Sequence, residues 1–421
     1  MSTVHGSPLD DLRAARREFD DVVAEIRAVP GYRDFLTEPR FDDIARAATD
    51  QPLCYLAAAD DGGSAFVVRD GEVDHVALPG LGAPAVHDAV SAHLGGYHAF
   101  RASGGAAFEG WAADLDARTG WLWDAVMGPV LDRIGAVEEI TVVAGGLLGL
   151  LPLHAAWCPD SSTATGRHYA VDSAAISYVP NARSLTTARE RAARAGYGKA
   201  LVVADPTSTG LEPLPSARFE AMAMSAGSTS VLAGSDATAD RVRDGLRTAE
   251  VLHFACHGIA DLLSPVDSRL ALADGESLTL RDLLALKVTA RLAVLSACET
   301  AMPGTDLPDE ALGLPMGLLQ AGAAGVVASL WAVHDLSTTM LMVEFHRRWA
   351  GGELSPAQAL RQAQRWVRDS TNAEKASAWR AAEGLPAELV EHLDDELSLR
   401  EPRHRDESPV HAWAAFQHIG A

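Results

Sequence analysis

The sequence is poor in cysteine, and its cysteines do not form metal-binding or redox pairs. It has 421 residues and four cysteines, Cys54, Cys158, Cys256 and Cys298. No two of them form a C-x-x-C motif, and the histidines are scattered, so we expect no bound metal or cofactor. A G-x-S-x-G motif and a G-x-x-x-x-G-K-[ST] phosphate loop are also missing, which argues against an α/β hydrolase and against a nucleotide-binding enzyme.

Basic residues are few. The chain has 35 Lys and Arg against 57 Asp and Glu, a formal net charge of -22 at pH 7. Such a surface repels phosphate, and no Lys/Arg cluster interrupts it, so we expect neither direct nucleic-acid binding nor binding to anionic membranes. The N-terminus is charged and has no apolar h-region, which predicts a cytoplasmic protein without a signal peptide. The hydrophobic share of 48% excludes disorder for most of the chain.

One long run, 311–333, contains no charged side chain. It is long enough to cross a bilayer, which takes about 20 apolar residues. However, Pro315 and several glycines interrupt it, and the helical pattern LPMGLLQAGA changes to the strand-like pattern GVVASLWAV. We therefore predict a buried helix followed by a buried strand.

The first third of the chain is expected to form a lead-in. Residues 1–50 show helical spacing of apolar residues, broken at Pro30-Gly31. Residues 51–137 begin with short strand-like runs, in which Asp70-Gly71 is typical of a hairpin turn, and continue as helix.

Residues 138–421 alternate between strands and helices. Apolar, β-branched runs occur at 140–144, 200–205, 229–234, 250–256, 291–297 and 325–333. Continuous apolar strands separated by helices predict an α/β fold with a mostly parallel sheet covered on both faces. Ser355-Pro356 is typical of a helix start, and Ser337 is expected to cap another helix.

Residues 371–410 carry ten acidic and five basic side chains. We expect this segment to be an exposed insertion, followed by a last core element, HAWAAFQHIG.

Candidate catalytic residues follow two of the predicted strands. His257-Gly258 follows VLHFAC, and Cys298 follows LAVLSA. If the strands are neighbours, a thiol and an imidazole meet at the carboxyl edge of the sheet, where functional groups collect in open α/β sheets. This pair suffices for a cysteine nucleophile, and the N–H groups of Gly258 and Cys298 are candidate oxyanion donors. The alternative is that Cys298 fills the core and His257 is structural.

The segments LHFACHG (252–258) and LSACETA (295–301) resemble the two signatures of the CHAT family of caspase-like cysteine peptidases, whose motifs lie roughly forty residues apart. The stretches ITVVAGGLLGLLPLHAAW, AISYVPNARSL and HAWAAFQHIG resemble further family elements, so the likeness covers residues 25–421. It implies a caspase-like fold with His257 as the catalytic histidine and Cys298 as the nucleophile. The caspase pattern Q-A-C-[RQG]-G is only partly met, so cleavage after Asp is not implied.

A second histidine and a second cysteine lie close to His257 in the sequence but are not expected to be catalytic. His253 lies within its strand, on the other face from the catalytic side, and is expected to be structural. Cys256 precedes His257, so its side chain should point to the opposite side of an extended strand.

The resemblance also suggests where a substrate side chain binds. SLWAVHD is similar to the strand that walls the first specificity pocket in this clan, which makes Asp335 a candidate partner for a basic side chain. Asp335 also precedes a predicted helix, so it is equally a candidate cap. Asp309, with Asp306 and Glu310, is a rival acid, and Trp331 is either a pocket wall or a core residue.

These observations lead to two hypotheses. The first is a cysteine endopeptidase that cleaves a protein partner after a basic or otherwise defined residue. The resemblance implies regulation by a partner or signal in a bacterial defence or cell-death system, with 1–50 or 371–410 as docking surfaces for a regulatory protein. The second is a catalytically silent CHAT-like scaffold. Retention of both His257 and Cys298 favours the first.

Overall fold

The structure is a computed structural model, and it describes residues 8–30, 33, 35–38, 40–224, 228–261, 264–296, 313–350 and 352–421. The chain divides into two units, Met1–Ile44 and Ala45–Ala421. The first unit contains helix α1 (Pro8–Ala28). Near the end of this helix, Arg27 Nε donates a hydrogen bond to the carbonyl of Phe35. Helix α2 (Phe41–Ala47) leads into the second unit.

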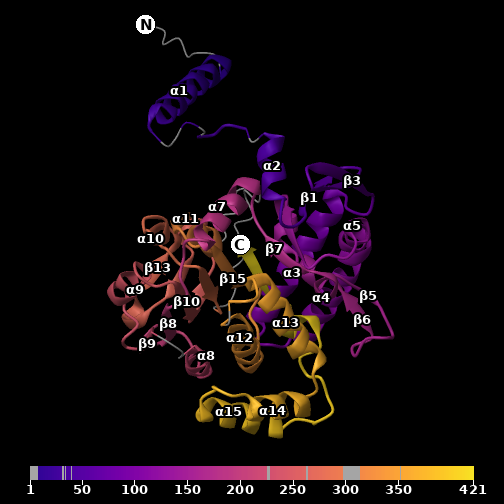
Figure 1. Ribbon diagram of the computed structural model, residues 1–421, viewed down its shortest axis with the longest axis vertical. Coiled ribbons are helices and arrows are strands. Elements are labelled where there is room, and N and C mark those ends of the chain that lie inside the picture. The colour runs from indigo at the N-terminus through magenta and orange to yellow at the C-terminus, as the bar shows by residue number, and fades with distance from the viewer. Residues whose placement is uncertain are drawn as a thin grey trace. The chain divides into compact units, whose positions relative to one another are not determined.

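An 11-stranded sheet forms the centre of the second unit within the described residues (Figure 1). In spatial order its strands are β3 (Glu72–Leu78), β2 (Gly62–Arg69), β1 (Leu53–Ala59), β4 (Glu139–Ala144), β7 (Ala175–Tyr178), β16 (Phe416–Gly420), β15 (Gly325–Ser329), β14 (Leu292–Leu295), β10 (Val251–Ala255), β8 (Lys199–Pro206) and β9 (Ser228–Gly234). The pairs β1/β2, β2/β3 and β15/β16 are antiparallel, and the others are parallel. The hairpin lead-in therefore continues the same sheet as the C-terminal strands.

Helices cover both faces of this sheet. Every residue of β10, β14, β15 and β16 is buried, as expected for strands enclosed on two sides. The helices are α3 (Ala83–Ala102), α4 (Phe108–Leu122), α5 (Gly128–Ile134), α6 (Ala170–Ser173), α7 (Ala182–Ala192), α8 (Ala217–Ala223), α9 (Ala239–Leu246), α10 (Leu280–Leu284), α11 (Leu314–Ala321), α12 (Asp335–Trp349), α13 (Pro356–Asp369), α14 (Asn372–Ala381), α15 (Ala387–Ser398) and α16 (Val410–Trp413). A π-helix, Trp123–Met127, joins α4 to α5, and short 3-10 helices span Gly146–Leu150, Leu153–Ala155, Pro265–Asp267 and Ala273–Gly275. The predicted α/β fold with a mostly parallel, doubly covered sheet is confirmed.

Two small sheets complete the fold. Strands β11 (Gly258–Ile259), β12 (Arg269–Ala271) and β13 (Ser277–Thr279) form one, and β5 (Trp157–Pro159) pairs with β6 (Arg167–Tyr169) in the other. The first begins directly after His257 and so extends the carboxyl end of β10.

Most local predictions agree with the structure. Asp70 and Gly71 both have positive φ, 53° and 79°, in the turn between β2 and β3, as the predicted hairpin requires. The charge-free run contains α11 and then β15, both largely buried, so the helix-and-strand prediction is confirmed. None of the described helices is both long and apolar enough to cross a membrane.

The two predicted helix caps had different outcomes. Ser355 accepts a hydrogen bond from Gln358 N and begins α13 with Pro356 in its first turn. The cap predicted at Ser337 was wrong, because α12 begins at Asp335 and Ser337 is buried inside it. His334 is the N-cap, and its non-helical ψ of 138° marks the end of the preceding loop.

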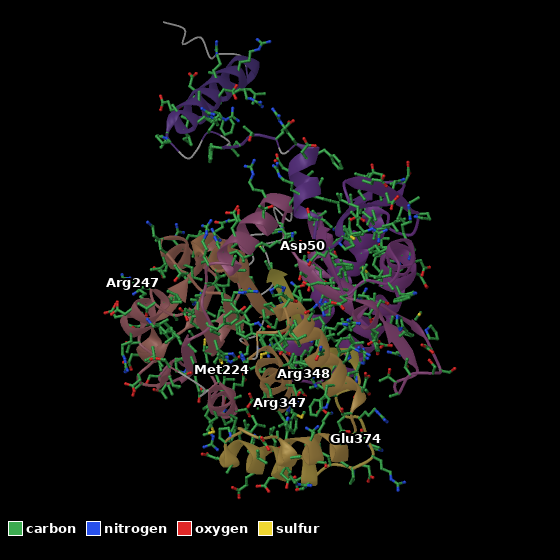
Figure 2. All side chains as sticks on the ribbon, in the orientation of Figure 1. Asp50, Met224, Arg247, Arg347, Arg348 and Glu374 are labelled. Carbon is green, nitrogen blue, oxygen red and sulfur yellow. The ribbon has the colours of Figure 1, made fainter. Side chains whose placement is uncertain are left out.

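The acidic segment 371–410 contains the helix pair α14 and α15, drawn in yellow and orange in Figure 1. The segment is not wholly exposed, because Leu389, Leu393, Leu397 and Trp379 are buried. Trp379 Nε1 donates a hydrogen bond to the buried carboxylate of Glu344 on α12, 3.1 Å away. Arg347 and Arg348, labelled in Figure 2, pair with the same carboxylate. The outer face of α15 carries the exposed acids Glu388, Glu391 and Asp395.

Candidate active site

The two strands that precede the predicted dyad lie side by side. β10 and β14 are parallel neighbours, with Phe254 opposite Leu295. Their carboxyl ends therefore meet at the same edge of the sheet, and the condition set by the sequence is fulfilled. His257 follows β10, and the described part of the chain after β14 ends at Ser296. Cys298, Asp306, Asp309 and Glu310 lie outside the described residues, so their roles stay predictions.

His257 is partly exposed, and its imidazole is held by a backbone carbonyl. Its Nε2 lies 2.7 Å from the carbonyl oxygen of Glu212, in the loop between β8 and α8. A carbonyl only accepts hydrogen bonds, so Nε2 carries the proton and Nδ1 is the basic nitrogen of the neutral ring. Sequence reasoning missed this contact, since any residue type supplies a carbonyl.

The backbone around His257 is fixed by the small sheet. Gly258 pairs with Leu270, and Ala271 N donates a hydrogen bond to the His257 carbonyl, 2.8 Å away. The role of the Gly258 N–H as an oxyanion donor stays a prediction, because its proposed partner, Cys298 N, is not described.

A cavity of about 70 Å³ lies at the carboxyl ends of β10, β14 and β15. It is lined by residues of these strand ends and of α8, α12 and β16: Leu214, Ala217, Glu220, Ala255, Cys256, Ser296, Ser329, Trp331, Val333, Asp335, Thr338 and Phe416. Two of the predicted substrate-binding residues, Asp335 and Trp331, are among them. The cavity adjoins the chain positions directly before His257 and shortly before Cys298.

Asp335 begins α12 and faces a different helix. Its Oδ2 accepts a hydrogen bond from Ser216 N, the residue before α8, at 3.2 Å. The cap residue of α12 is His334, so Asp335 is not the cap of its own helix.

Trp331 is both a core residue and part of the cavity wall. It is fully buried, and its Nε1 donates a hydrogen bond to the carbonyl of His411, 3.0 Å away. Its ring makes edge contacts with those of Trp111 and His93, with centroids 6.1 Å and 6.0 Å apart.

Glu220 on α8 is a second carboxyl of this cavity, and the sequence analysis missed it. It is 3% exposed, and its Oε2 lies 2.9 Å from His253 Nε2. Burial raises the pKa of Glu220 to about 8; a hydrogen bond from Ser296 opposes this shift, and the nearby charge of Asp335 adds to it. In the sequence it is one acid in an ordinary amphipathic helix, with no motif around it.

His253 lies inside the sheet, as expected, and links Glu220 to α12. Its Nδ1 is 3.0 Å from His346 Nε2, and its Nε2 is also 3.3 Å from the Ser296 hydroxyl. Burial lowers the pKa of His253 to about 3, so its ring is neutral. Cys256, which is 1% exposed, faces the cavity, whereas His257 is partly exposed.

Within the described ranges, no group of three or more His, Cys, Asp or Glu side chains is arranged to hold a metal ion. The structure thus describes an oriented imidazole and a small cavity with two carboxyls at the same edge of the sheet.

The CHAT domain family model matches residues 116–421. The chain belongs to the CHAT family. The match covers the body of the chain from α4 to the last strand, including both strand ends described above.

Comparison with solved structures shows the fold. The separase–securin complex of Saccharomyces cerevisiae matches with a TM-score of 0.56 and 9% sequence identity over 90% of this chain and 30% of that one. A second structure of the same complex gives a TM-score of 0.56 at 10% identity, over 90% of this chain and 31% of that one. The Arg-specific cysteine proteinase gingipain R matches with a TM-score of 0.37 at 10% identity, over 73% of this chain and 67% of that one. The CHAT chain thus shares the caspase-like fold of the separase chain and spans less than a third of its length. No curated protein sequence matches it significantly.

Proposed function

We propose that this CHAT protein is a cysteine endopeptidase in which Cys298 is the nucleophile and His257 the general base and acid. The observation that carries the proposal is the pairing of β10 with β14, whose carboxyl ends lead to His257 and, three residues after β14, to Cys298. The Glu212 carbonyl supports the same role for His257, because it leaves Nδ1 as the basic nitrogen.

The chemistry follows from these groups. His257 takes the thiol proton, and the Cys298 sulfur attacks the peptide carbonyl carbon to form a tetrahedral oxyanion, with the N–H groups of Gly258 and Cys298 as its donors. The carbon–nitrogen bond then breaks as His257 gives its proton to the leaving amine. Water, deprotonated by His257, hydrolyses the resulting thioester and releases the carboxylate product and the thiol.

We further propose that the cavity receives a basic side chain on the amino side of the cleaved bond. Asp335 would pair with this side chain, and Trp331 would exclude water from the pair. A carboxylate in a largely enclosed cavity attracts a cation more strongly than one in water. Asp309 stays a rival candidate for this role.

We also propose that the protein is cytoplasmic and belongs to a bacterial defence or cell-death system. A protein partner would regulate its activity. The acidic outer face of α15 (Glu388, Glu391 and Asp395) is a suitable docking surface for a basic partner, and residues 1–50 are the other candidate. A silent scaffold function is the competing proposal, and activity measurements separate the two.

The proposal is tested with a positional-scanning peptide library and a thiol-reactive peptide probe, applied with and without the products of neighbouring genes. Wild type should cleave and be labelled, whereas Cys298→Ala should do neither and His257→Gln should cleave at least about a hundredfold more slowly. Cys158→Ala is the matched control, since this cysteine lies in β5, away from the cavity, and should behave as wild type.

The peptidase proposal is refuted if wild type and Cys298→Ala cleave the same peptides, or none, and the probe does not label Cys298. The scaffold function would then remain. For the cavity, Asp335→Asn should lose the preference for basic side chains and keep thiol labelling. An unchanged basic preference in this variant would exclude Asp335 and turn attention to Asp309.

A further inference from the structure

The cavity holds two carboxyls that come from separate parts of the chain. Glu220 lies on α8 and Asp335 at the start of α12, and both helices pack together beside β10. Asp335 is the only one of the two with a sequence signal, because it follows the SLWAVHD strand.

Glu220 is held in a fixed direction by buried neutral groups. His253 contacts its Oε2, and His346 contacts His253 from the far side. Burial lowers the pKa of both histidines, and the charge of His253 adds to the shift at His346, so neither supplies a positive charge at neutral pH. Among the described residues, no Lys or Arg pairs with Glu220 or Asp335 within 4.0 Å. Both carboxyls are therefore held by neutral groups, and a carboxyl in a cavity with a strongly shifted pKa is a candidate functional residue.

We propose that Glu220 is a second specificity residue of this cavity, and that Glu220 and Asp335 together hold a guanidinium group, so that the enzyme prefers Arg to Lys. This inference rests on the proposed peptidase function. The volume of about 70 Å³ exceeds several times the roughly 10–15 Å³ that one water needs, so the cavity admits a small cationic group.

The geometry favours guanidinium over ammonium. Asp335 uses Oδ2 for Ser216 N, and Glu220 uses Oε2 for His253 and also has a hydrogen bond from Ser296. Each carboxylate oxygen can accept more than one hydrogen bond, so both carboxyls keep acceptor capacity for a ligand. A guanidinium has donors that point in several fixed directions and can bond two carboxyls at once. An ammonium group acts as a point charge and gains less from the second carboxyl.

A pH dependence follows from this arrangement. Glu220, with its pKa of about 8, holds a proton in the empty cavity at neutral pH. The titratable groups that face it are His253 on β10, Asp335 and, through His253, His346 on α12, and Cys256 at the end of β10. A bound guanidinium favours the ionised carboxyl, so binding releases the proton to solvent. The preference for Arg should therefore rise with pH up to about 8, by at most about tenfold per pH unit, and then level off.

The test uses three peptides that differ only in the residue before the cleaved bond: Arg, Lys and citrulline, the neutral isostere of Arg. The ratios of kcat/KM between peptides cancel the titration of the catalytic dyad. Wild type should show an Arg/citrulline ratio that rises between pH 6 and 8. Glu220→Gln should still cleave the citrulline peptide, with an Arg/citrulline ratio independent of pH and an Arg/Lys ratio lowered about tenfold.

Glu391→Gln is the matched control, because this acid is exposed on α15 and should leave both ratios unchanged. Should Glu220→Gln fail to fold, Glu220→Asp keeps the charge but shortens its reach, and it should retain the pH dependence while lowering the Arg/Lys ratio. This inference fails if the folded Glu220 variant keeps the wild-type Arg/citrulline and Arg/Lys ratios and their pH dependence. The proposed function would still stand if Asp335→Asn loses the preference for basic side chains. If wild type cleaves no peptide, both fail.

Discussion

Phe219 of α8 stacks face to face on His392 of α15, with ring centroids 3.8 Å apart and an interplanar angle of 5°. Arg218 also reaches Glu388 on α15, at 3.6 Å. Glu220, which follows Phe219 in the chain, lines the cavity. Helix α8 thus touches the acidic helix pair with one side and the candidate pocket with the other, so a partner that moves α15 has a direct mechanical route to Glu220.

We expect the Phe219–His392 stack to anchor α15. In a double-mutant cycle of Phe219→Ala and His392→Ala, the coupling free energy of unfolding should be about 0.5–1.5 kcal/mol. Hydrogen exchange over residues 387–398 should be faster in either variant. Arg218→Ala, which removes the exposed ion pair with Glu388 and the cation–π contact with the Phe219 ring, should lower the free energy of unfolding by about 1–2 kcal/mol. Equal exchange in His392→Ala and wild type would show that the stack does not hold α15.

The sequence predicted those parts of the site that leave a trace in residue type or pattern. The apolar runs before His257 and Cys298 predicted β10 and β14, because buried parallel strands need such runs on both faces. Glu220 left no such trace, since its environment is created by His253 and His346, which are distant in sequence and meet it only in the fold.

Contacts made by backbone atoms also cannot be predicted from residue types. The Glu212 carbonyl orients His257, and any residue type could supply it. The misplaced cap at Ser337 has a similar cause. The N-cap of α12 is His334, three residues before the serine, and Asp335 lies in the first turn while its carboxylate accepts a hydrogen bond from Ser216 N of another segment.

Acid should destabilise the second unit through its buried histidines. Burial lowers the pKa of His93 and His154 to about 4, and that of His253 and His418 to about 3. The unfolded chain, with histidine pKa values near 6.5, then binds more protons than the folded chain below that pH. The contribution of these histidines to stability is therefore fully present above pH 6.5 and is lost as pH falls towards their folded-state pKa values, by up to roughly 1.4 kcal/mol per pH unit for each histidine.

Urea unfolding between pH 7 and 4.5 measures this loss. His154→Gln should reduce the slope, because it removes a ring that is held neutral between the Tyr178 hydroxyl and the Ala414 carbonyl. His75→Gln, at an exposed site on β3, should leave the slope unchanged. A stability that does not vary with pH over this range would contradict the assignment of neutral buried rings.

The start of α13 is expected to be sensitive at Ser355. Its hydroxyl accepts from Gln358 N and donates to the carboxyl of Glu139, 2.8 Å away. Ser355→Ala removes the cap and one donor of a partly buried acid, so it should cost about 1–2 kcal/mol in the free energy of unfolding. Ser355→Thr, which keeps the hydroxyl, should recover most of the loss in the same urea measurement. Full stability of the alanine variant would mean that water replaces both bonds.

The end of α11 requires a glycine at position 322, for two separable reasons. Gly322 has a φ of 130°, and a Cβ there would lie 2.0 Å from the Val288 carbonyl oxygen, a backbone atom that cannot rotate away. Gly352 also has positive φ, 69°, but a Cβ there meets nothing within 4 Å. Gly352→Ala should therefore cost only the backbone strain, about 1–2 kcal/mol, whereas Gly322→Ala should cost that strain plus about 1–3 kcal/mol for displacing the Val288 segment. Thermal and urea unfolding of the two variants give the difference. Because α11 follows the segment that contains Cys298, Gly322→Ala should also lower any peptidase activity more than Gly352→Ala does. Equal losses of stability in the two variants would refute the steric argument.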